Sequence, residues 1–201
     1  MESLIALALG YALGSIPFGL ILTSLSGAGD LRAIGSGNIG ATNVLRTGRK
    51  GIAAATLLLD LLKALSAVLL ARHFWPGHEA LAALGAILGH CFPVWLRFKG
   101  GKGVASMMGA SLGLAWPIGL AYAVTWLGLL AITRISSLAG LTAALVAPVA
   151  AWWLGHDDYA LVLAAIAVLV LVLHRGNIQR LLAGTEPVSY THLTLPTILL
   201  V

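Results

Sequence analysis

Long apolar stretches alternate with short polar ones along the chain, and this alternation is typical of a protein that crosses a membrane several times. A helix needs about 20 apolar residues to cross roughly 30 Å of hydrocarbon. Seven stretches approach or reach that length, so the pattern predicts about seven transmembrane helices. Their limits are 3–24, 51–71, 80–97, 103–117, 118–133, 137–154 and 159–173.

The fourth stretch is short and meets the fifth near Trp116-Pro117, so we expect it to be tilted or partly re-entrant. Glycines four positions apart recur in three stretches and predict close contact between helices. These pairs are Gly10 and Gly14, Gly85 and Gly89, and Gly109 and Gly113. The expected fold is all-α, a polytopic membrane helical bundle.

The composition supports the membrane class. Of 201 residues, 59% are hydrophobic and only 9% are charged, which excludes an ordinary soluble domain. Cys91 is the one cysteine, so an internal disulfide is also excluded. The net charge of +5 could indicate a nucleic-acid partner, but membrane topology explains it better, and no nucleic acid is predicted.

The basic residues gather on one side of the predicted membrane. With seven spans, the connections on the C-terminal side carry ten of the twelve Lys and Arg residues. The positive-inside rule therefore places the N-terminus outside and the C-terminus in the cytoplasm. Merging the fourth and fifth stretches would move three of these residues to the other side, so the charges favour seven spans. The ten are Arg32, Arg46, Arg49, Lys50, Arg97, Lys99, Lys102, Arg134, Arg175 and Arg180.

The first polar cluster runs from Arg32 to Arg46, between two apolar stretches, and is rich in Gly, Asn, Ser and Thr. Glycine lets a backbone approach an anion closely, and the two flanking arginines would supply charge for a phosphate. A tight structural turn is the alternative. The spacing GxGxxG at 35–40 does not indicate a dinucleotide site, because that motif needs a βαβ context.

The second cluster, 97–103, has glycines around Lys102 and opens the fourth apolar stretch. It is not a Walker A loop, because Gly103 stands where Ser or Thr is needed. A glycine turn at a helix N-terminus still offers N–H groups to an anion. A basic anchor at the membrane surface is the alternative, and it explains the charges but not the glycines.

The third cluster, 174–180, follows the last apolar stretch. His174 and Asn177 are three residues apart and share one face if the segment is helical. We expect this pair to have a functional role, and a basic interfacial anchor is again the alternative.

A few polar residues fall within or beside the apolar stretches. Asp60 and Lys63 are three residues apart, and because buried charges are costly, they are expected to pair. His90 either hydrogen bonds between helices or serves the site. Ser136 and Ser137 border the sixth stretch, where either could cap a helix. The chain has no C-x-x-C or H-E-x-x-H, so neither a metal nor a cofactor is predicted.

These motifs together resemble the PlsY family of bacterial membrane glycerol-3-phosphate acyltransferases, over about residues 1–186. The resemblance is carried by long motifs in the same order. They are 14–19 (GSIPFG), the run 32–46, 89–94 (GHCFPV), 98–105 (FKGGKGVA) and 174–186, which reads HRxNIxRLxxGxE.

The resemblance implies a reaction in which an acyl group moves from acyl phosphate to the 1-hydroxyl of glycerol 3-phosphate, giving lysophosphatidic acid and phosphate for phospholipid synthesis. It implies a multi-pass protein of the bacterial inner membrane with its site facing the cytoplasm. The partners would be glycerol 3-phosphate, acyl phosphate and membrane lipid, with no obligate protein partner.

Three sets of site residues are expected on this basis. The catalytic set is His174, Asn177 and Asn38. The set that binds substrate phosphate is Ser36, Gly37, Gly40, Thr42, Asn43, Arg46, Lys102 and Gly103. The supporting set is Asp60, Lys63, His90 and Ser137.

Two other functions fit part of the pattern. A transporter or channel for phosphorylated small solutes could use glycine-rich anion sites, but its polar residues should continue through the bilayer. A scaffold bound to anionic lipid would explain the basic face but not the asparagines and glycines. Residues 1–186 are expected to form a single domain, and the uncharged tail 187–201 is expected to be of doubtful origin.

Overall fold

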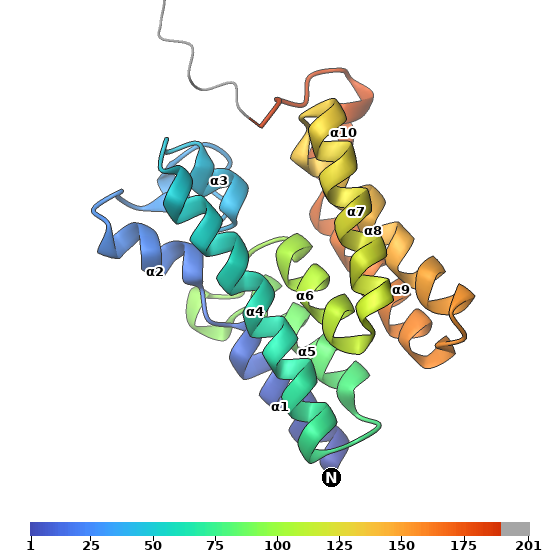
Figure 1. Ribbon diagram of the computed structural model, residues 1–201. Coiled ribbons are helices and arrows are strands. Elements are labelled where there is room, and N and C mark those ends of the chain that lie inside the picture. The colour runs from blue at the N-terminus through green and yellow to red at the C-terminus, as the bar shows by residue number, and fades with distance from the viewer. Residues whose placement is uncertain (190–201) are drawn as a thin grey trace, which may run out of the picture.

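The computed structural model describes residues 1–189, and all regular elements within them are helices, which confirms the all-α prediction (Figure 1). Most of the predicted tail, 190–201, lies outside the described residues. In chain order the elements are α1 (Glu2–Gly14), α2 (Phe18–Leu25), η1 (Leu31–Ala33), α3 (Ala41–Leu45), α4 (Lys50–Phe74), α5 (Glu79–Cys91), η2 (Val94–Leu96), α6 (Val104–Leu114), α7 (Trp116–Thr133), α8 (Ser136–Trp153), α9 (Asp157–Leu173) and α10 (Arg175–Leu182).

The first apolar stretch is interrupted in its middle. α1 ends at Gly14 and α2 begins at Phe18, because Pro17 between them has no N–H to continue the helical hydrogen bonds. The ammonium group of Lys63 in α4 donates to the carbonyl of Ile16 at 2.8 Å. This contact ties the interruption to the interior of the bundle.

Small residues bring the helix backbones into contact, as predicted. A Cβ added to Gly10 or Gly14 of α1 would overlap the backbone of α5. One added to Gly85 or Gly89 of α5 would overlap the backbone of α1, and one added to Gly109 of α6 would overlap that of α4. Close approach through glycine is a common way for membrane helices to gain packing energy.

The pattern predicts seven membrane crossings, and this number stays a prediction. Five helical stretches among residues 1–189 are long and apolar enough to cross, and α9 with α10 makes a sixth if this pair, bent by 65°, is one span. The predicted fourth stretch contains the 11-residue α6, which is about 16 Å long at 1.5 Å per residue, and the first two residues of α7. The orientation of the termini stays a prediction.

α6 packs against α4, α7, α8 and α9. Buried alanines fill much of the core between these helices, together with a few larger side chains such as Met107 and Tyr122. Figure 1 shows the N-terminus at one end of the bundle and both α3 and α10 toward the opposite end. The first and third polar clusters, which are far apart in sequence, therefore lie at the same end.

Candidate active site

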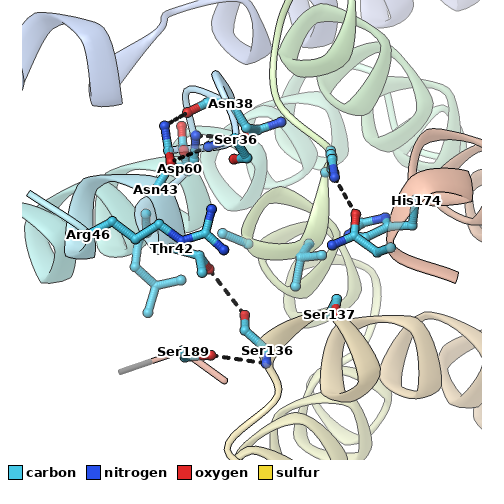
Figure 2. A pocket seen from close by; sticks show the side chains of 18 of the residues that line it. Ser36, Asn38, Thr42, Asn43, Arg46, Asp60, Ser136, Ser137, His174 and Ser189 are labelled. Atoms are coloured by element: carbon cyan, nitrogen blue, oxygen red, sulfur yellow. Dashed lines mark hydrogen bonds between the residues drawn. The ribbon is translucent and has the colours of Figure 1, made fainter. Parts of the chain in front are cut away.

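A cavity of about 120 Å³ lies where the three predicted polar clusters meet (Figure 2). One water needs roughly 10–15 Å³ on this measure, so the cavity has room for a small polar solute. Gly37 and Lys63 are the two predicted site residues that do not line it. Those that do are Ser36, Asn38, Gly40, Thr42, Asn43, Arg46, Asp60, His90, Lys102, Gly103, Ser137, His174 and Asn177.

Asn43 in α3 holds the first cluster in shape. Its amide nitrogen donates to the carbonyl of Leu31 at 3.0 Å, of Ile34 at 2.9 Å and of Asn38 at 2.8 Å. Its amide oxygen accepts from the N–H of Ser36 at 3.1 Å. The side chain is buried, and its hydrogen-bonding groups are all used by the loop itself, so Asn43 organises the loop more directly than it could bind phosphate.

Several backbone N–H groups of this loop are also used internally. The N–H of Gly37 donates to the carbonyl of Ile34 at 3.0 Å, and that of Gly40 donates to the side-chain oxygen of Asn38 at 2.9 Å. Gly37 has a φ of +69°, so its role is to form the turn. The N–H groups of Gly37 and Gly40 therefore do not form the predicted cradle for an anion. Side chains of the same loop, among them Ser36, line the cavity instead.

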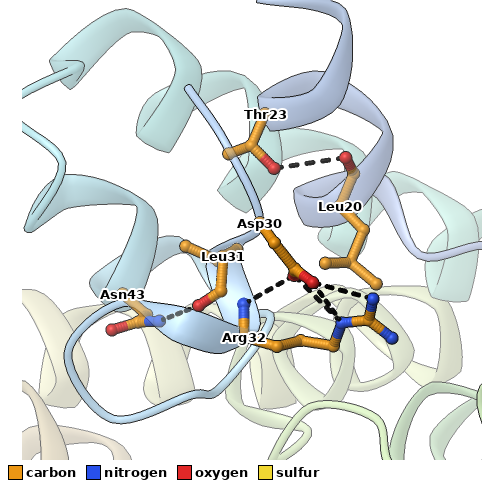
Figure 3. A network of polar contacts seen from close by, with 6 residues as sticks. All are labelled: Leu20, Thr23, Asp30, Leu31, Arg32 and Asn43. Atoms are coloured by element: carbon orange, nitrogen blue, oxygen red, sulfur yellow. Dashed lines mark hydrogen bonds and ion pairs between the residues drawn. The ribbon is translucent and has the colours of Figure 1, made fainter. Parts of the chain in front are cut away.

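The two arginines of the first cluster differ in position. Arg46 lines the cavity. Arg32 does not, and it forms an ion pair with Asp30 at 2.8 Å on the exposed surface (Figure 3). Hydrogen bonds from Arg32 hold the pKa of Asp30 below its usual range. The expectation that both arginines would supply charge for a phosphate is therefore wrong for Arg32.

The glycine turn before α6 packs tightly onto the end of α5. The N–H groups of Gly100 and Gly101 donate to the carbonyls of Cys91 and His90, both at 3.0 Å. A Cβ on Gly101 would overlap the His90 ring, and one on Gly100 would overlap the backbone of α5. The glycines are thus required for close packing, and that packing fixes the position of Lys102 in the cavity.

Lys102 is surrounded by other cations. Burial lowers its pKa, and the positive charges of Arg180 and Arg46 act in the same direction. The ammonium group donates to the side-chain oxygen of Asn177 on α10. Three cations from three separate segments therefore share one cavity, an arrangement suited to a polyvalent anion such as a phosphate.

His174 lies directly after α9 and is 4% exposed. Burial lowers its pKa to about 4, so the ring is neutral at pH 7. The Nδ1 atom lies 2.8 Å from the carbonyl of Val170, and because a carbonyl only accepts, Nδ1 carries the hydrogen. The Nε2 atom of the neutral ring is then a hydrogen-bond acceptor.

Glu186 connects the third cluster to α8. It accepts from Ser137 at 2.6 Å, from the amide nitrogen of Asn177, and from Arg180 at 2.7 Å. Burial alone would raise the pKa of Glu186, but these hydrogen bonds hold it below its usual range. The carboxylate sets the amide of Asn177 so that its oxygen faces Lys102.

The predicted pair of Asp60 and Lys63 is present and buried, with 2.6 Å between the Oδ1 and Nζ atoms. His90 adds a third member, because its Nδ1 lies 3.7 Å from the same Oδ1. Asp60 and His90 reach the cavity, while Lys63 turns to the interruption after α1. Of the three, His90 packs against the glycine turn that carries Lys102.

A further contact joins α3 to α8 across the cavity. The hydroxyl of Thr42 on α3 lies 3.1 Å from that of Ser136 on α8, as Figure 2 shows. The N–H of Ser136 in turn donates to the hydroxyl of Ser189 at 3.1 Å. Within residues 1–189, no group of three or more His, Cys, Asp or Glu side chains could hold a metal ion.

Sequence reasoning missed several residues that line the cavity, which are Ser136, Arg180, Glu186 and Trp126. Arg180 was interpreted as an anchor and Ser136 as a helix cap. Glu186 was noted only as the last residue of a motif. Trp126 lies inside an apolar stretch, and nothing in the local sequence distinguishes it from a lipid-facing aromatic residue.

Comparison with known proteins identifies the class. The sequence model of the family described as glycerol-3-phosphate acyltransferase matches residues 4–184. A glycerol-3-phosphate acyltransferase from Novosphingobium aromaticivorans is 74% identical over 187 residues, which are 93% of this chain and 95% of the relative. The corresponding protein from Erythrobacter litoralis is 58% identical over the same shares of the two chains.

Two crystal structures of PlsY (YgiH), an integral membrane glycerol 3-phosphate acyltransferase, have the same fold. The glycerol 3-phosphate form matches with a TM-score of 0.88 and 36% identity, and the lysophosphatidic acid form with 0.84 and 33%. Both matches cover 93% of this chain and 95% of the solved chain. The fold and the cavity thus define a multi-pass membrane acyltransferase.

This chain belongs to the PlsY family of glycerol-3-phosphate acyltransferases, as its motifs predicted.

Proposed function

We propose that this protein transfers an acyl group from acyl phosphate to the 1-hydroxyl of glycerol 3-phosphate, giving lysophosphatidic acid and inorganic phosphate. The observation that carries the proposal is the meeting of Arg46, Lys102 and Arg180 with a neutral His174 in one cavity. The names of the relatives support the acceptor, since one solved relative holds glycerol 3-phosphate and another lysophosphatidic acid.

The proposed chemistry needs no cofactor. The oxygen of the 1-hydroxyl attacks the acyl carbonyl carbon, and the bond between that carbon and the phosphate oxygen breaks. Phosphate leaves with the electron pair, and the proton of the hydroxyl ends on the phosphate. The protein contributes mainly by holding the hydroxyl and the carbonyl carbon together, because orientation alone can supply much of a rate enhancement.

In this proposal, charged and hydroxyl side chains bind the two phosphates. Arg46 and Lys102 supply positive charge, and Ser36 and Thr42 supply hydroxyl donors from the wall formed by the first cluster. The remaining members of the predicted phosphate set give these side chains their positions. They are Gly37, Gly40, Asn43 and Gly103.

His174 is proposed to orient the reacting hydroxyl. Its Nε2 atom accepts a hydrogen bond from that hydroxyl, and its low pKa makes it a weak base, so the departing phosphate is the final proton acceptor. Asn177 orients the neighbouring Lys102. The side-chain oxygen of Asn38 accepts a hydrogen bond from the N–H of Gly40, so the amide nitrogen of Asn38 is the group that can donate to substrate.

The protein is further proposed to lie in a bacterial inner membrane, with residues 1–186 as a single domain and the cavity open to the cytoplasm. The basic residues around the cavity support this side, because positively charged connections favour the cytoplasmic face. Its partners would be the two substrates and membrane lipid, with no obligate protein partner.

The test is acylation of glycerol 3-phosphate by the purified protein in detergent or lipid. Palmitoyl phosphate, palmitoyl-CoA and palmitoyl acyl carrier protein are compared as donors, and lysophosphatidic acid is measured. We expect product from acyl phosphate alone. Product from a thioester instead would keep the acyltransferase and overturn the donor. No product from any donor, with folded protein, would overturn the proposal and favour a transporter, which vesicle uptake of labelled glycerol 3-phosphate would detect.

A further inference from the structure

Trp126 presents an unsatisfied hydrogen-bond donor beside the cavity. Its Nε1 atom is fully buried and has no hydrogen-bond partner among residues 1–189. Trp126 belongs to α7, which is one of the candidate membrane spans, so lipid tails supply no acceptor there. An indole N–H is a donor only, and burying it without an acceptor is unfavourable. Its natural partner is a ligand in the cavity that Trp126 lines.

The position of Trp126 is fixed by its neighbour one turn earlier. Tyr122 lies on the same face of α7, because residues four apart on a helix are adjacent. Its hydroxyl donates to the carbonyl of Val104, the first residue of α6, at 3.0 Å. This contact sets α7 against the segment that follows Lys102 and Gly103, so Trp126 is held close to the phosphate-binding turn.

The cavity that Trp126 lines also has an apolar part, which includes Val104, the residue whose carbonyl accepts from Tyr122. The cavity is lined at Leu57, Val104 and Ala105 by side chains of carbon alone. Glycerol 3-phosphate has no apolar part that would favour such a wall. An acyl chain does, and the first oxygen atom beyond that chain is the carbonyl oxygen.

We propose that the indole N–H of Trp126 donates a hydrogen bond to the carbonyl oxygen of the acyl donor. This inference rests on the proposed function, and it adds a catalytic residue that touches the reacting group. When the glycerol hydroxyl attacks the carbonyl carbon, negative charge develops on this oxygen until the bond to phosphate breaks. A buried donor aimed at that oxygen stabilises the charge more in the transition state than in the ground state.

The variant Trp126→Phe removes the N–H and keeps an aromatic ring. We expect turnover with palmitoyl phosphate to fall by about 10-fold or more, because loss of one donor to a developing oxyanion has a large effect. The KM for glycerol 3-phosphate should stay within about twofold of wild type, since the phosphate-binding side chains are unchanged. Trp153→Phe is the matched control, because this tryptophan is exposed on α8 and lies outside the cavity, and it should leave turnover unchanged.

A pair of inhibitors distinguishes the loss of a hydrogen bond to the carbonyl oxygen from a change in the packing around residue 126. 2-Oxoheptadecylphosphonate has a carbonyl at the position of the acyl carbonyl, and heptadecylphosphonate differs only by lacking it. Wild type should bind the ketone about three- to tenfold more tightly, as one hydrogen bond predicts, and Trp126→Phe should lose this preference. If both inhibitors weaken equally in the variant, or if the preference persists, Trp126 is a packing residue and the inference is overturned.

A second measurement uses wild-type protein and does not depend on the variant's folding. The chain has six tryptophans, whose ¹⁵N-labelled indole N–H signals are countable. One of these signals should move downfield with the ketone and not with heptadecylphosphonate. Identical spectra with the two inhibitors would overturn the inference. Failure of the proposed donor is separable, because wild-type protein would then make no product from palmitoyl phosphate whatever happens at Trp126.

Discussion

Replacement of Asn43 by alanine should cost more activity than replacement of any charged residue on the outside of the same loop. The Asn43 side chain makes four hydrogen bonds to backbone atoms of the segment 31–38. The amide NH2 has only two hydrogens, so these contacts amount to about three full hydrogen bonds, and at about 1 kcal/mol each they hold the loop with about 3 kcal/mol. This segment presents Ser36 and Asn38 to the cavity, so its disorder removes substrate contacts without touching the other two clusters.

The expected loss follows from the fraction of protein with an ordered loop. A factor of ten in kcat/KM corresponds to about 1.4 kcal/mol, so losing part or all of about 3 kcal/mol gives about a 10- to 150-fold decrease. Asn43→Asp should be no better, because its carboxylate would face three carbonyl oxygens. The assay is the initial rate of acylation at varied glycerol 3-phosphate, with thermal unfolding measured in the same detergent.

Arg32→Ala is the matched control. Arg32 belongs to the same loop and makes a conspicuous ion pair with Asp30, but the pair is exposed, and exposed pairs contribute little (Figure 3). The backbone N–H of residue 32 can still donate to Asp30 in this variant. We expect kcat/KM within about twofold of wild type. If Asn43→Ala stays within about threefold while Arg32→Ala falls further, the assignment of the two roles is refuted.

Three further variants test the other walls of the cavity. Arg46→Ala should mainly raise the KM for glycerol 3-phosphate, and an unchanged KM in a substrate titration would contradict its phosphate role. Gly101→Ala should lower activity more than 10-fold by displacing the turn from His90; rates close to wild type would show that the turn can move. His174→Gln should abolish a loss of stability on acidification. The pKa of His174 is about 4 in the folded protein and about 6.5 in the unfolded protein, so the unfolded protein binds more protons between these two pH values. The free energy of unfolding of wild type therefore falls by up to about 3 kcal/mol as the pH falls through this window. Equal shifts of the unfolding midpoint between pH 7 and 4.5 in both proteins would argue against a buried neutral His174.

The hydrophobic pattern was sufficient to predict that the chain is helical, and the number of crossings stays a prediction. The hydrophobic pattern shows which segments are apolar but not why. The segment α6 is apolar because it is buried among other helices, so its pattern does not by itself indicate a membrane crossing. Pro17 does signal the interruption between α1 and α2, because proline cannot donate the hydrogen bond of a helix interior. The glycine pairs were the most reliable guide to packing, since their spacing directly predicts which faces can approach.

Thirteen of the fifteen predicted site residues line one cavity, and their roles stay predictions. Residue types that suit phosphate marked all three clusters, and the structure brings them into one cavity. The sequence could not show that the side-chain amide of Asn43 forms its hydrogen bonds within the loop, because its partners are backbone atoms whose positions depend on the fold. Arg32 was misassigned for a more avoidable reason, since Asp30 stands two residues away. Trp126 carries no local signal at all.

The three walls of the cavity share a design in which protein groups hold the polar side chains before substrate arrives. Asn43 fixes the first wall, the glycine turn is bonded to the end of α5, and Glu186 fixes Asn177 and through it Lys102. Such preorganisation means that little reorganisation is needed at the moment of reaction. It also explains why the proposed catalyst needs no strong base. If the hydroxyl and the carbonyl carbon are held in line and phosphate is a good leaving group, a neutral His174 has only to orient the hydroxyl. In the arrangement we propose, Trp126 adds a donor for the acyl carbonyl oxygen, while Arg46 and Lys102 bind the phosphates.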